Sequence, residues 1–588
     1  MNKQIQYTGL ALNMLFGLCV FLFLGYFYRY HLVYQEQFQM FLFTSDYLAE
    51  TTHKPGGFAD YAGRFFTQFY YIPWLGALFI ALLLMLIQRQ LLKIADNFGK
   101  KPAFMPLTFI PSLFYWILLC EEHYMLAGVI SLVMALMAMQ VYMQIDSKRL
   151  RIVYALLMLP MLYWLAGGTY VVFAILCILL EINAKEITRM DILLYTIGCL
   201  VLIIALPLLA RGIWGQYPLS KLWSGANYYR YQTIFPSTIL LLWGTVILVP
   251  VLFRYLPSFT RPGTKWIWTG ALIMALGFLT NKGIIRMADW QKEEIMTYDY
   301  YIRKQQWDEV IRMANQKTPM SPLSVSFLNL ALCKQGLMSD QMFRYFQNGP
   351  EGLMPSFVRD FTMPMMAGEV YYHLGFVNTA QRFAFEAMEA IPDFQKSSRA
   401  VKRLAETNLV NGEYVVAGKY LRMLQHTLYY RDWANKTWTV LRDEKKIEAN
   451  PEWSHLRRYR TQTDFLFSEQ EKEQMLGVLL QQDFTNRMAY EYLMAYCLLT
   501  KDLQHFFSYY PLGKEIAGQQ IPLSYQEALI YIWGLSNNDP TTIPYPVSAD
   551  VKRRVQEYGR VYTNYQNSEP MLKNQFSDTY WYYLHFRK

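Results

Sequence analysis

The sequence predicts an all-α protein in two parts: a polytopic bundle of about nine transmembrane helices over residues 1–283, and a soluble helical domain over residues 284–588. Three observations predict this fold class. Only 17% of the 588 residues are charged, against about 25% in an ordinary soluble chain. Apolar runs of membrane-spanning length fill the first half. Short amphipathic helices separated by turns fill the second half, without strand-like alternation.

The apolar runs define the membrane part. A helix needs about 20 apolar residues to cross about 30 Å of hydrocarbon, because each residue adds about 1.5 Å. Two of the runs are short and meet at Gly167-Gly168, which predicts a tight helical hairpin. The predicted spans are 7–27, 70–87, 104–120, 124–145, 152–166, 170–180, 192–209, 237–253 and 266–281.

The distribution of charge orients this bundle. Residues 1–283 contain 20 Lys and Arg against 11 Asp and Glu, and an N-terminus inside places 13 of those 20 in cytoplasmic segments. Lys and Arg accumulate on the cytoplasmic side of membranes. We therefore expect a multi-pass protein of the bacterial inner (cytoplasmic) membrane, with a cytoplasmic N-terminus, an uncleaved first span and a periplasmic C-terminal domain.

The sequence also argues against several function classes. The basic residues of the first half lie in short gaps between apolar runs and not on a soluble module, so we expect no nucleic-acid partner. Ionisable residues are scarce in the middle of the predicted spans, which makes ion-coupled transport a weak interpretation. The sequence holds no phosphate-binding glycine loop, no HExxH and no nucleophile elbow. Any chemistry should therefore lie at the outer interface.

The first outer segment, residues 29–69, is too long for a simple turn. Aromatic and polar residues interleave over 34–47 and again over 58–66, on either side of Pro55-Gly56-Gly57. This pattern predicts two helices lying in the membrane interface. Helices that only plug the bundle would show the same pattern.

Two further outer segments concentrate polar residues. In Glu121-Glu122-His123, two carboxylates and an imidazole could bind a divalent cation or hold a catalytic base. A polar turn that keeps a helical hairpin out of the lipid would need the same residues. The third segment, 211–236, sets Arg211, Lys221 and Arg230 among Trp and Tyr residues. This composition suits a lipid phosphate, and it suits an ordinary interfacial anchor equally well.

This layout resembles the GT-C superfamily of membrane glycosyltransferases, which use polyprenyl-phosphate-linked sugars. The resemblance covers about the first 280 residues and rests on an inside N-terminus, one span and a long first outer loop with acidic residues. A second acidic cluster and a later basic loop complete it. The chain also resembles an uncharacterised bacterial family that joins such a membrane half to a helical-repeat tail.

The resemblance implies a role for each candidate residue. The first-loop carboxylate, Glu36 or Asp46, would act as catalytic base or metal ligand. Many members of the superfamily carry paired acids here, whereas Glu36 stands alone between glutamines and Asp46 follows ten residues later. The other implied residues are Glu121, Glu122 and His123, as supporting acids or ligands of a divalent cation, and Arg211, Lys221 and Arg230, as ligands of the donor phosphate.

The second half shows a degenerate repeat. Two helix-turn-helix units fit the spacing of a tetratricopeptide repeat (TPR), and their equivalent alanines, Ala380 and Ala417, are 37 residues apart. Small residues at such sites permit close helix approach. We therefore expect a TPR-like solenoid. The residues that fit are Gly368, Tyr371, Gly375, Ala380, Ala387 and Pro392 in one unit, and Ala405, Gly412, Tyr414, Ala417, Leu421 and Leu424 in the next.

Two hypotheses of different classes follow. In the first, the protein transfers a sugar from a lipid-phosphate donor on the outer side of the membrane, and the TPR-like tail presents a protein or glycan acceptor. In the second, the tail recruits envelope proteins and the bundle only anchors it, without catalysis. The cysteines favour neither hypothesis, because they form no CxxC or metal spacing. The sequence does not decide whether Cys333 and Cys497 form a disulfide.

Overall fold

The protein is helical throughout the residues that its structure, a computed structural model, describes. Those residues contain no strand beyond one isolated bridge between Tyr124 and Tyr229, which confirms the predicted all-α fold class. The described ranges are 3–184, 189–213, 215, 217–226, 228–229, 237–259, 261–358, 362–392, 395–460, 467–513, 520–536, 542–565 and 567–587.

The chain divides into two compact units. The first comprises Met1–Trp290 together with two short segments of the second half, Ile391–Ser398 and His426–Arg431. The second comprises Gln291–Ala390, Arg399–Gln425 and Asp432–Lys588. The division near Trp290 lies slightly beyond the predicted boundary at residue 283, because the last long helix of the first unit continues to Met287.

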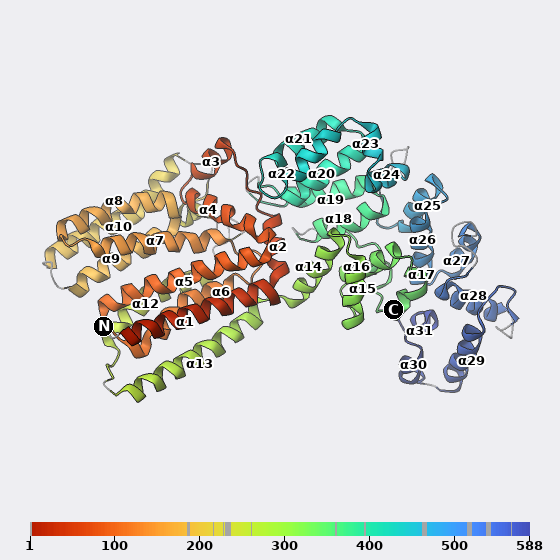
Figure 1. Cartoon of the computed structure of the whole chain (residues 1–588), viewed down its shortest axis with the longest axis horizontal. Coiled ribbons are helices and arrows are strands. Elements are labelled where there is room, and N and C mark those ends of the chain that lie inside the picture. The colour runs from red at the N-terminus through yellow and green to blue at the C-terminus, as the bar shows by residue number, and fades with distance from the viewer. Residues whose placement is uncertain are drawn as a thin grey trace. The chain divides into compact units, whose positions relative to one another are not determined.

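The first unit is a bundle of long helices with shorter helices at one end (Figure 1). Its described helices are α1 Lys3–Leu22, α2 Arg29–Gln37, α3 Ser45–Thr52, α4 Gly57–Thr67, α5 Pro73–Phe98, α6 Ile110–Leu118, α7 Leu126–Gln144, α8 Lys148–Ala166, α9 Tyr170–Ala184, α10 Arg189–Ile213, α11 Leu219–Ser224, α12 Ser237–Tyr255 and α13 Pro262–Met287.

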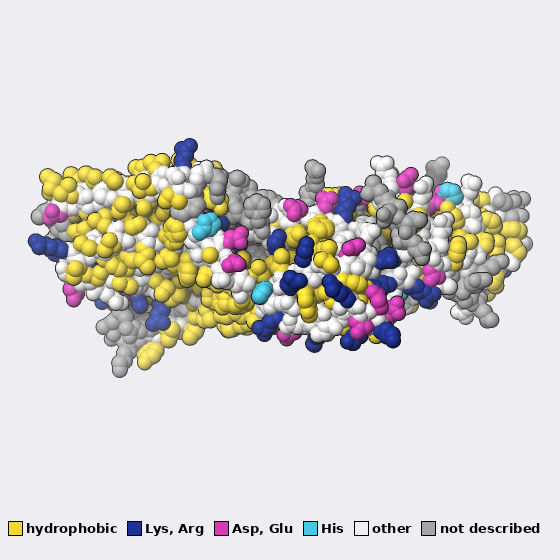
Figure 2. Space-filling model, turned by 90° about the horizontal axis from the view of Figure 1, so that it is seen from above, with side chains coloured by type: hydrophobic (Ala, Val, Ile, Leu, Met, Phe, Trp, Pro, Cys, Tyr) yellow, Lys and Arg dark blue, Asp and Glu magenta, His cyan; other side chains and the backbone are white. Residues whose placement is uncertain are grey.

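The long helices have the length and composition of membrane spans. Seven stretches of the described chain qualify, and a shorter apolar helical stretch covers Pro102–Leu118. One of the seven, Lys148–Ala184, contains two predicted spans, so the number nine stays a prediction. The most apolar windows of α10 and α13 are only 17% buried. Hydrophobic side chains cover much of the visible face of the first unit (Figure 2), as expected of a surface that contacts lipid.

The interior of the bundle is built around α5 and α7. Helix α5 packs against α1, α7 and α12, and α7 packs against α4, α8 and α9 as well. The sequence of α7 is apolar on all sides, which is typical of a helix with neighbours all around it. Accordingly, 72% of its most apolar window is buried.

The structure confirms the predicted hairpin at Gly167-Gly168. Helix α8 ends at Ala166, and Gly167 adopts a positive φ of 68° that a side chain would disfavour. At the far end of the hairpin, Nε of Arg151 lies 2.8 Å from Oε1 of Glu181. Residues 30 apart in one continuous helix would be about 45 Å apart. Helices α8 and α9 are therefore antiparallel neighbours.

Three glycines with positive φ allow three loops to touch through their backbones. Gly56, Gly167 and Gly225 have φ of 72°, 68° and 67°. A Cβ on Gly225 would lie 2.5 Å from Cα of Gly167, and one on Gly56 would lie 2.2 Å from the backbone nitrogen of Ala226. The first outer segment, the α8–α9 turn and the third outer segment therefore meet at one point of the first unit.

The second unit consists of shorter helices that pair as hairpins (Figure 1), among them α15 with α16, α18 with α19 and α25 with α26. Its described helices are α14 Trp290–Arg303, α15 Trp307–Gln316, α16 Pro322–Lys334, α17 Met338–Gln341, α18 Met363–Leu374, α19 Val377–Glu389, α20 Ser398–Asn411, α21 Tyr414–Gln425, α22 Arg431–Val440, α23 Glu444–Glu448, α24 Pro451–Arg458, α25 Lys472–Gln482, α26 Arg487–Thr500, α27 Leu503–Tyr509, α28 Leu523–Ser536, α29 Ala549–Asn564, α30 Glu569–Phe576 and α31 Tyr580–Phe586.

The two predicted repeat units are present as helix-turn-helix elements. Helices α18 and α19 join through Gly375, and α20 and α21 join through Gly412, with φ of 102° and 82°. A Cβ on Gly368 would lie 3.3 Å from Cβ of Phe383, so a small residue is needed where α18 packs on α19. Their assignment to the TPR type stays a prediction. Cys333 and Cys497 are buried and free, not joined as a disulfide.

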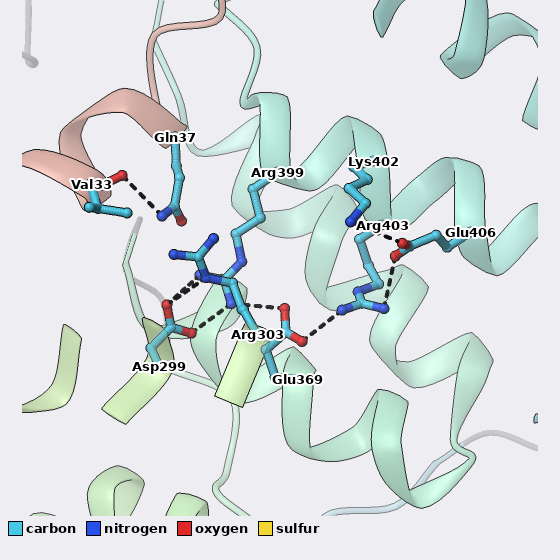
Figure 3. Close-up of polar contacts among 9 residues, drawn as sticks. All are labelled: Val33, Gln37, Asp299, Arg303, Glu369, Arg399, Lys402, Arg403 and Glu406. Carbon is cyan, nitrogen blue, oxygen red and sulfur yellow. Dashed lines mark hydrogen bonds and ion pairs between the residues drawn. The ribbon is translucent and has the colours of Figure 1, made fainter. Parts of the chain in front are cut away.

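A buried ion network joins three helices of the second unit (Figure 3). Arg399 on α20 forms two hydrogen bonds to Asp299 on α14, of 2.9 and 2.7 Å, and one of 2.9 Å to Glu369 on α18. Arg403 binds the other oxygen of Glu369 at 2.6 Å and lies 2.9 Å from Glu406. Burial would raise the pKa of Glu369, but the charges of Arg403 and Arg399 outweigh it and hold that pKa well below its usual range.

A second buried carboxyl group makes the stability of this unit depend on pH. Glu527 on α28 is 2% exposed and accepts a hydrogen bond of 2.7 Å from the backbone N–H of Tyr580. Burial raises the pKa of Glu527 to about 8, whereas an unfolded Glu has a pKa of about 4.3. The folded state therefore binds this proton more tightly than the unfolded state does.

We expect the second unit to lose stability as the pH rises from about 4.3 to 8, by at most about 1.4 kcal/mol per pH unit. Below this range Glu527 is protonated in both states, so its stabilising effect is complete there. Glu527→Gln stays neutral and should therefore reduce the loss of stability with rising pH. Glu557→Gln, on the exposed face of α29, should leave that loss unchanged. Hydrogen exchange of α28 amides at pH 5 and 8 measures the difference. An unchanged decline in Glu527→Gln would contradict the assignment.

Candidate functional site

The first outer segment differs from the two helices that its sequence predicts. The run 34–47 does not form one helix: α2 ends at Gln37 and α3 begins at Ser45. Between them, the backbone N–H of Met40 donates to the carbonyl of Lys396 at 3.1 Å, and that of Phe43 donates to the carbonyl of His426 at 2.8 Å. These distant carbonyls replace the partners that a continuous helix would supply, so the prediction was wrong here for a tertiary reason.

Glu36 lies where the first outer segment contacts the segment His426–Arg431. It is on α2 and is 4% exposed. The hydroxyl of Tyr430, from the segment His426–Arg431 of the first unit, donates to Oε2 of Glu36 at 3.1 Å. Tyr71, just beyond the first outer segment, stacks on Tyr429 with ring centroids 4.6 Å apart, which fixes the segment His426–Arg431 beside the end of the first outer segment. A buried carboxylate that accepts from a hydroxyl has the geometry of a general base with its substrate.

The second outer segment joins the same cluster. The side-chain amide of Gln35 donates to the carbonyl of Tyr124 at 3.3 Å. The hydroxyl of Tyr229, in the third outer segment, donates to Oε1 of Glu121 at 2.5 Å. The backbones of Tyr124 and Tyr229 also form the isolated bridge. The structure therefore brings the first, second and third outer segments together. Glu36 and Glu121 lie on neighbouring elements, Glu36 buried and Glu121 half-buried.

Glu122 and His123 form an ion pair of their own. Oε1 of Glu122 lies 3.0 Å from Nε2 of His123, and the Glu122 side chain is 9% exposed. A pocket lined by Gln35, Gln39 and Glu122 has a volume of about 10 Å³, enough for about one water molecule. As arranged here, this pocket is too small for a sugar.

The other predicted site residues do not all join this cluster. Asp46 is exposed in the first turn of α3, where a carboxylate is stabilised by the positive end of the helix dipole. Arg211 is exposed in the last turn of α10, whereas Lys221 on α11 is buried. Arg230 lies outside the described residues.

A buried ion pair in the first outer segment was not predicted from the sequence. Nζ of Lys54 lies 3.7 Å from Oδ2 of Asp60, and Asp60 is 1% exposed. Helix α4 turns a face of small and polar residues inward, including Asp60, Gly63 and Thr67, and leaves the aromatic Phe58 exposed. The spacing i, i+3, i+7 of these residues is the signal that could have revealed it. The other aromatic side chains of α4 are half-buried, and Tyr61 and Phe65 pack on Phe41.

The described part of the second outer segment does not assemble a three-residue metal site. Glu121 is engaged by Tyr229, and Glu122 pairs with His123. Within the described ranges, the group of His, Cys, Asp and Glu side chains with atoms close enough for one ion is Glu473, Asp502 and His505, in the second unit.

Comparison with known proteins gives a family and no activity. No curated protein and no solved structure matches the chain. One family description matches residues 3–587 and so covers both units. The family description thus includes both the bundle and the helical tail. The chain belongs to the family of unknown function DUF6057.

Proposed function

We propose that the first unit is a glycosyltransferase-like membrane protein that moves a sugar from a polyprenyl-phosphate donor on the outer side of the membrane. The observation that carries this proposal is the burial of Glu36 where the first and second outer segments meet. Taking a carboxylate out of water costs several kcal/mol. A bundle that served only as a membrane anchor would have no need for a buried carboxylate at this position.

In the proposed reaction, Glu36 takes the proton of an acceptor hydroxyl while the acceptor oxygen attacks the anomeric carbon. The bond between that carbon and the donor phosphate oxygen breaks, and the lipid phosphate leaves with the electron pair. The Tyr430 hydroxyl occupies the position of an acceptor hydroxyl on Glu36, so the acceptor must displace it. Lys221 and Arg211, on the third outer segment, supply positive charge for the leaving phosphate, and the helical tail presents the protein or glycan acceptor.

Glu36→Gln should lower sugar transfer about 10²-fold or more, because general-base catalysis contributes about 10²- to 10⁴-fold. The glutamine still offers an oxygen to the Tyr430 hydroxyl, so we expect the melting temperature to change little. The measurement is transfer from a panel of polyprenyl-phosphate sugars by the full-length protein in lipid nanodiscs. Glu50→Gln, on the exposed side of α3, is the matched control. Transfer at the wild-type rate by Glu36→Gln would exclude this role.

The second candidate is a membrane-anchored scaffold for envelope proteins, without catalysis. It is favoured by the occupation of both Glu36 and Glu121 by tyrosine hydroxyls and by the small size of the pocket beside Glu122. In a scaffold, Glu36→Gln would leave the cellular function intact. Substitutions on exposed faces of the tail, such as Val415→Asp on α21, would abolish that function. The two candidates therefore predict opposite outcomes for the same pair of variants.

A further inference from the structure

Three metal-ligating side chains of the second unit lie together and have no part in the proposed function. Glu473 is in the first turn of α25, Asp502 directly precedes α27, and His505 is in the first turn of α27. One ligand atom of each residue lies within 4.8 Å of the other two. The residues come from two helices, so the grouping is a product of the fold and not only of local sequence.

The distances fit the spacing of ligands around one ion. Nδ1 of His505 lies 3.1 Å from Oε1 of Glu473 and 2.9 Å from Oδ2 of Asp502. A zinc ion binds imidazole nitrogen and carboxylate oxygen at about 2.0–2.2 Å. By simple geometry, two such ligands are about 3.4 Å apart at the tetrahedral angle that zinc prefers and about 3 Å apart at the right angle of an octahedral ion such as manganese. The imidazole and each carboxylate already have a separation close to these values.

The local charge balance favours a cation. The two lysines next to these residues in sequence point elsewhere: Nζ of Lys472 donates to the carbonyl of Met354 at 2.8 Å, and Nζ of Lys501 donates to that of Arg587 at 2.5 Å. In the part of the chain that the structure describes, no Lys or Arg pairs with Glu473 or Asp502. Two carboxylates therefore share one imidazole.

Neighbouring hydrogen bonds hold the ligands in place. The hydroxyl of Tyr509 donates to Oε1 of Glu473 at 2.8 Å, and Oδ1 of Asp502 accepts from the backbone N–H of His505 at 3.0 Å. Such outer contacts orient ligands in metal sites. The His505 side chain is 48% exposed, which leaves room for an ion to enter and for water to complete its coordination.

We propose that Glu473, Asp502 and His505 bind one divalent metal ion of the zinc or manganese class. One imidazole and two carboxylates form a mixed set of nitrogen and oxygen ligands that suits these ions. The site is independent of the proposed sugar transfer, and its occupancy would stabilise the contact between α25 and the start of α27.

Calorimetric titration of the metal-stripped full-length protein in detergent with zinc chloride tests the proposal. We expect saturable binding of one ion per chain. His505→Ala and Asp502→Asn should each weaken it at least tenfold. Asn keeps the side-chain oxygen that caps α27, so Asp502→Asn removes charge without removing the cap. His53→Ala, at an exposed histidine of the first unit, should bind zinc as the wild type does.

Two further measurements distinguish a bound metal ion from a metal-free cluster of the same three side chains. Zinc affinity should fall as the pH is lowered, because protons compete with the metal ion for its ligands. Zinc should also raise the melting temperature of the wild type, by mass action, and not that of His505→Ala. Absence of saturable zinc binding, or binding by His505→Ala with wild-type affinity, would overturn the proposal. The three residues would then form only a cluster of polar contacts between α25 and α27.

Discussion

Replacing Glu369 with Gln should destabilise the second unit by about 3–5 kcal/mol, the cost of removing one partner from a buried ion network. Glu369 lies between Arg399 and Arg403 and is 3% exposed. Without its charge, the buried guanidinium of Arg399 and the half-buried one of Arg403 lose their shared counter-ion while remaining close to each other. Hydrogen exchange of backbone amides in α18 and α20 measures the loss, because their protection reports the free energy of opening.

Glu386→Gln provides the matched control for this prediction. It makes the same chemical change on α19, in an exposed pair with Arg382, and should cost less than about 1 kcal/mol. The pH dependence has a defined sign. The folded pKa of Glu369 is held below its unfolded value, so its stabilising effect is complete above about pH 4.3 and is lost as the pH falls. Equal losses of stability in Glu369→Gln and Glu386→Gln would show that the buried network stabilises the unit no more than an exposed ion pair does.

Gly225→Ala should prevent the first unit from folding correctly. The residue has a φ of 67°, which disfavours a side chain, and its new Cβ would lie 2.5 Å from Cα of Gly167. Because the obstacle is backbone on both sides, neither loop can move aside as a flexible side chain would. We expect a melting temperature at least several degrees lower, with most of the protein aggregated on size-exclusion chromatography in detergent.

Gly244→Ala is the control for this substitution. Gly244 lies in α12, and nothing lies within 4 Å of the position that its Cβ would take. Alanine in a helix is favoured over glycine by about 1 kcal/mol, so this variant should be as stable as the wild type or slightly more stable. A Gly225→Ala protein with the same melting temperature as Gly244→Ala would contradict the close approach of the loops.

Local sequence signals predicted the helices well and the site only in part. The apolar runs located the long helices, and Gly167-Gly168 located a turn, because both depend on residues near each other in sequence. Glu36 and Asp46 looked alike in sequence, yet one is buried and the other exposed. Tertiary contacts decided between them, since the partner of Glu36 is Tyr430, 394 residues away.

The charged interior of the second unit shows the same limit. Asp299 and Arg399 are 100 residues apart, and in sequence each reads as an ordinary surface charge on an amphipathic helix. Asp60 was missed for a similar reason, because an acidic residue on a short amphipathic helix looks like a surface charge until its packing is known.

The membership of Ile391–Ser398 and His426–Arg431 in the first unit has a consequence for biogenesis. A ribosome that has finished the last long helix must still synthesise about 140 residues before Tyr430 emerges, which takes about 7–28 s at 5–20 residues per second. During that interval the α2–α3 linker lacks the carbonyl partners of Met40 and Phe43. The α2–α3 linker therefore acquires its native hydrogen bonds only after most of the chain has been synthesised.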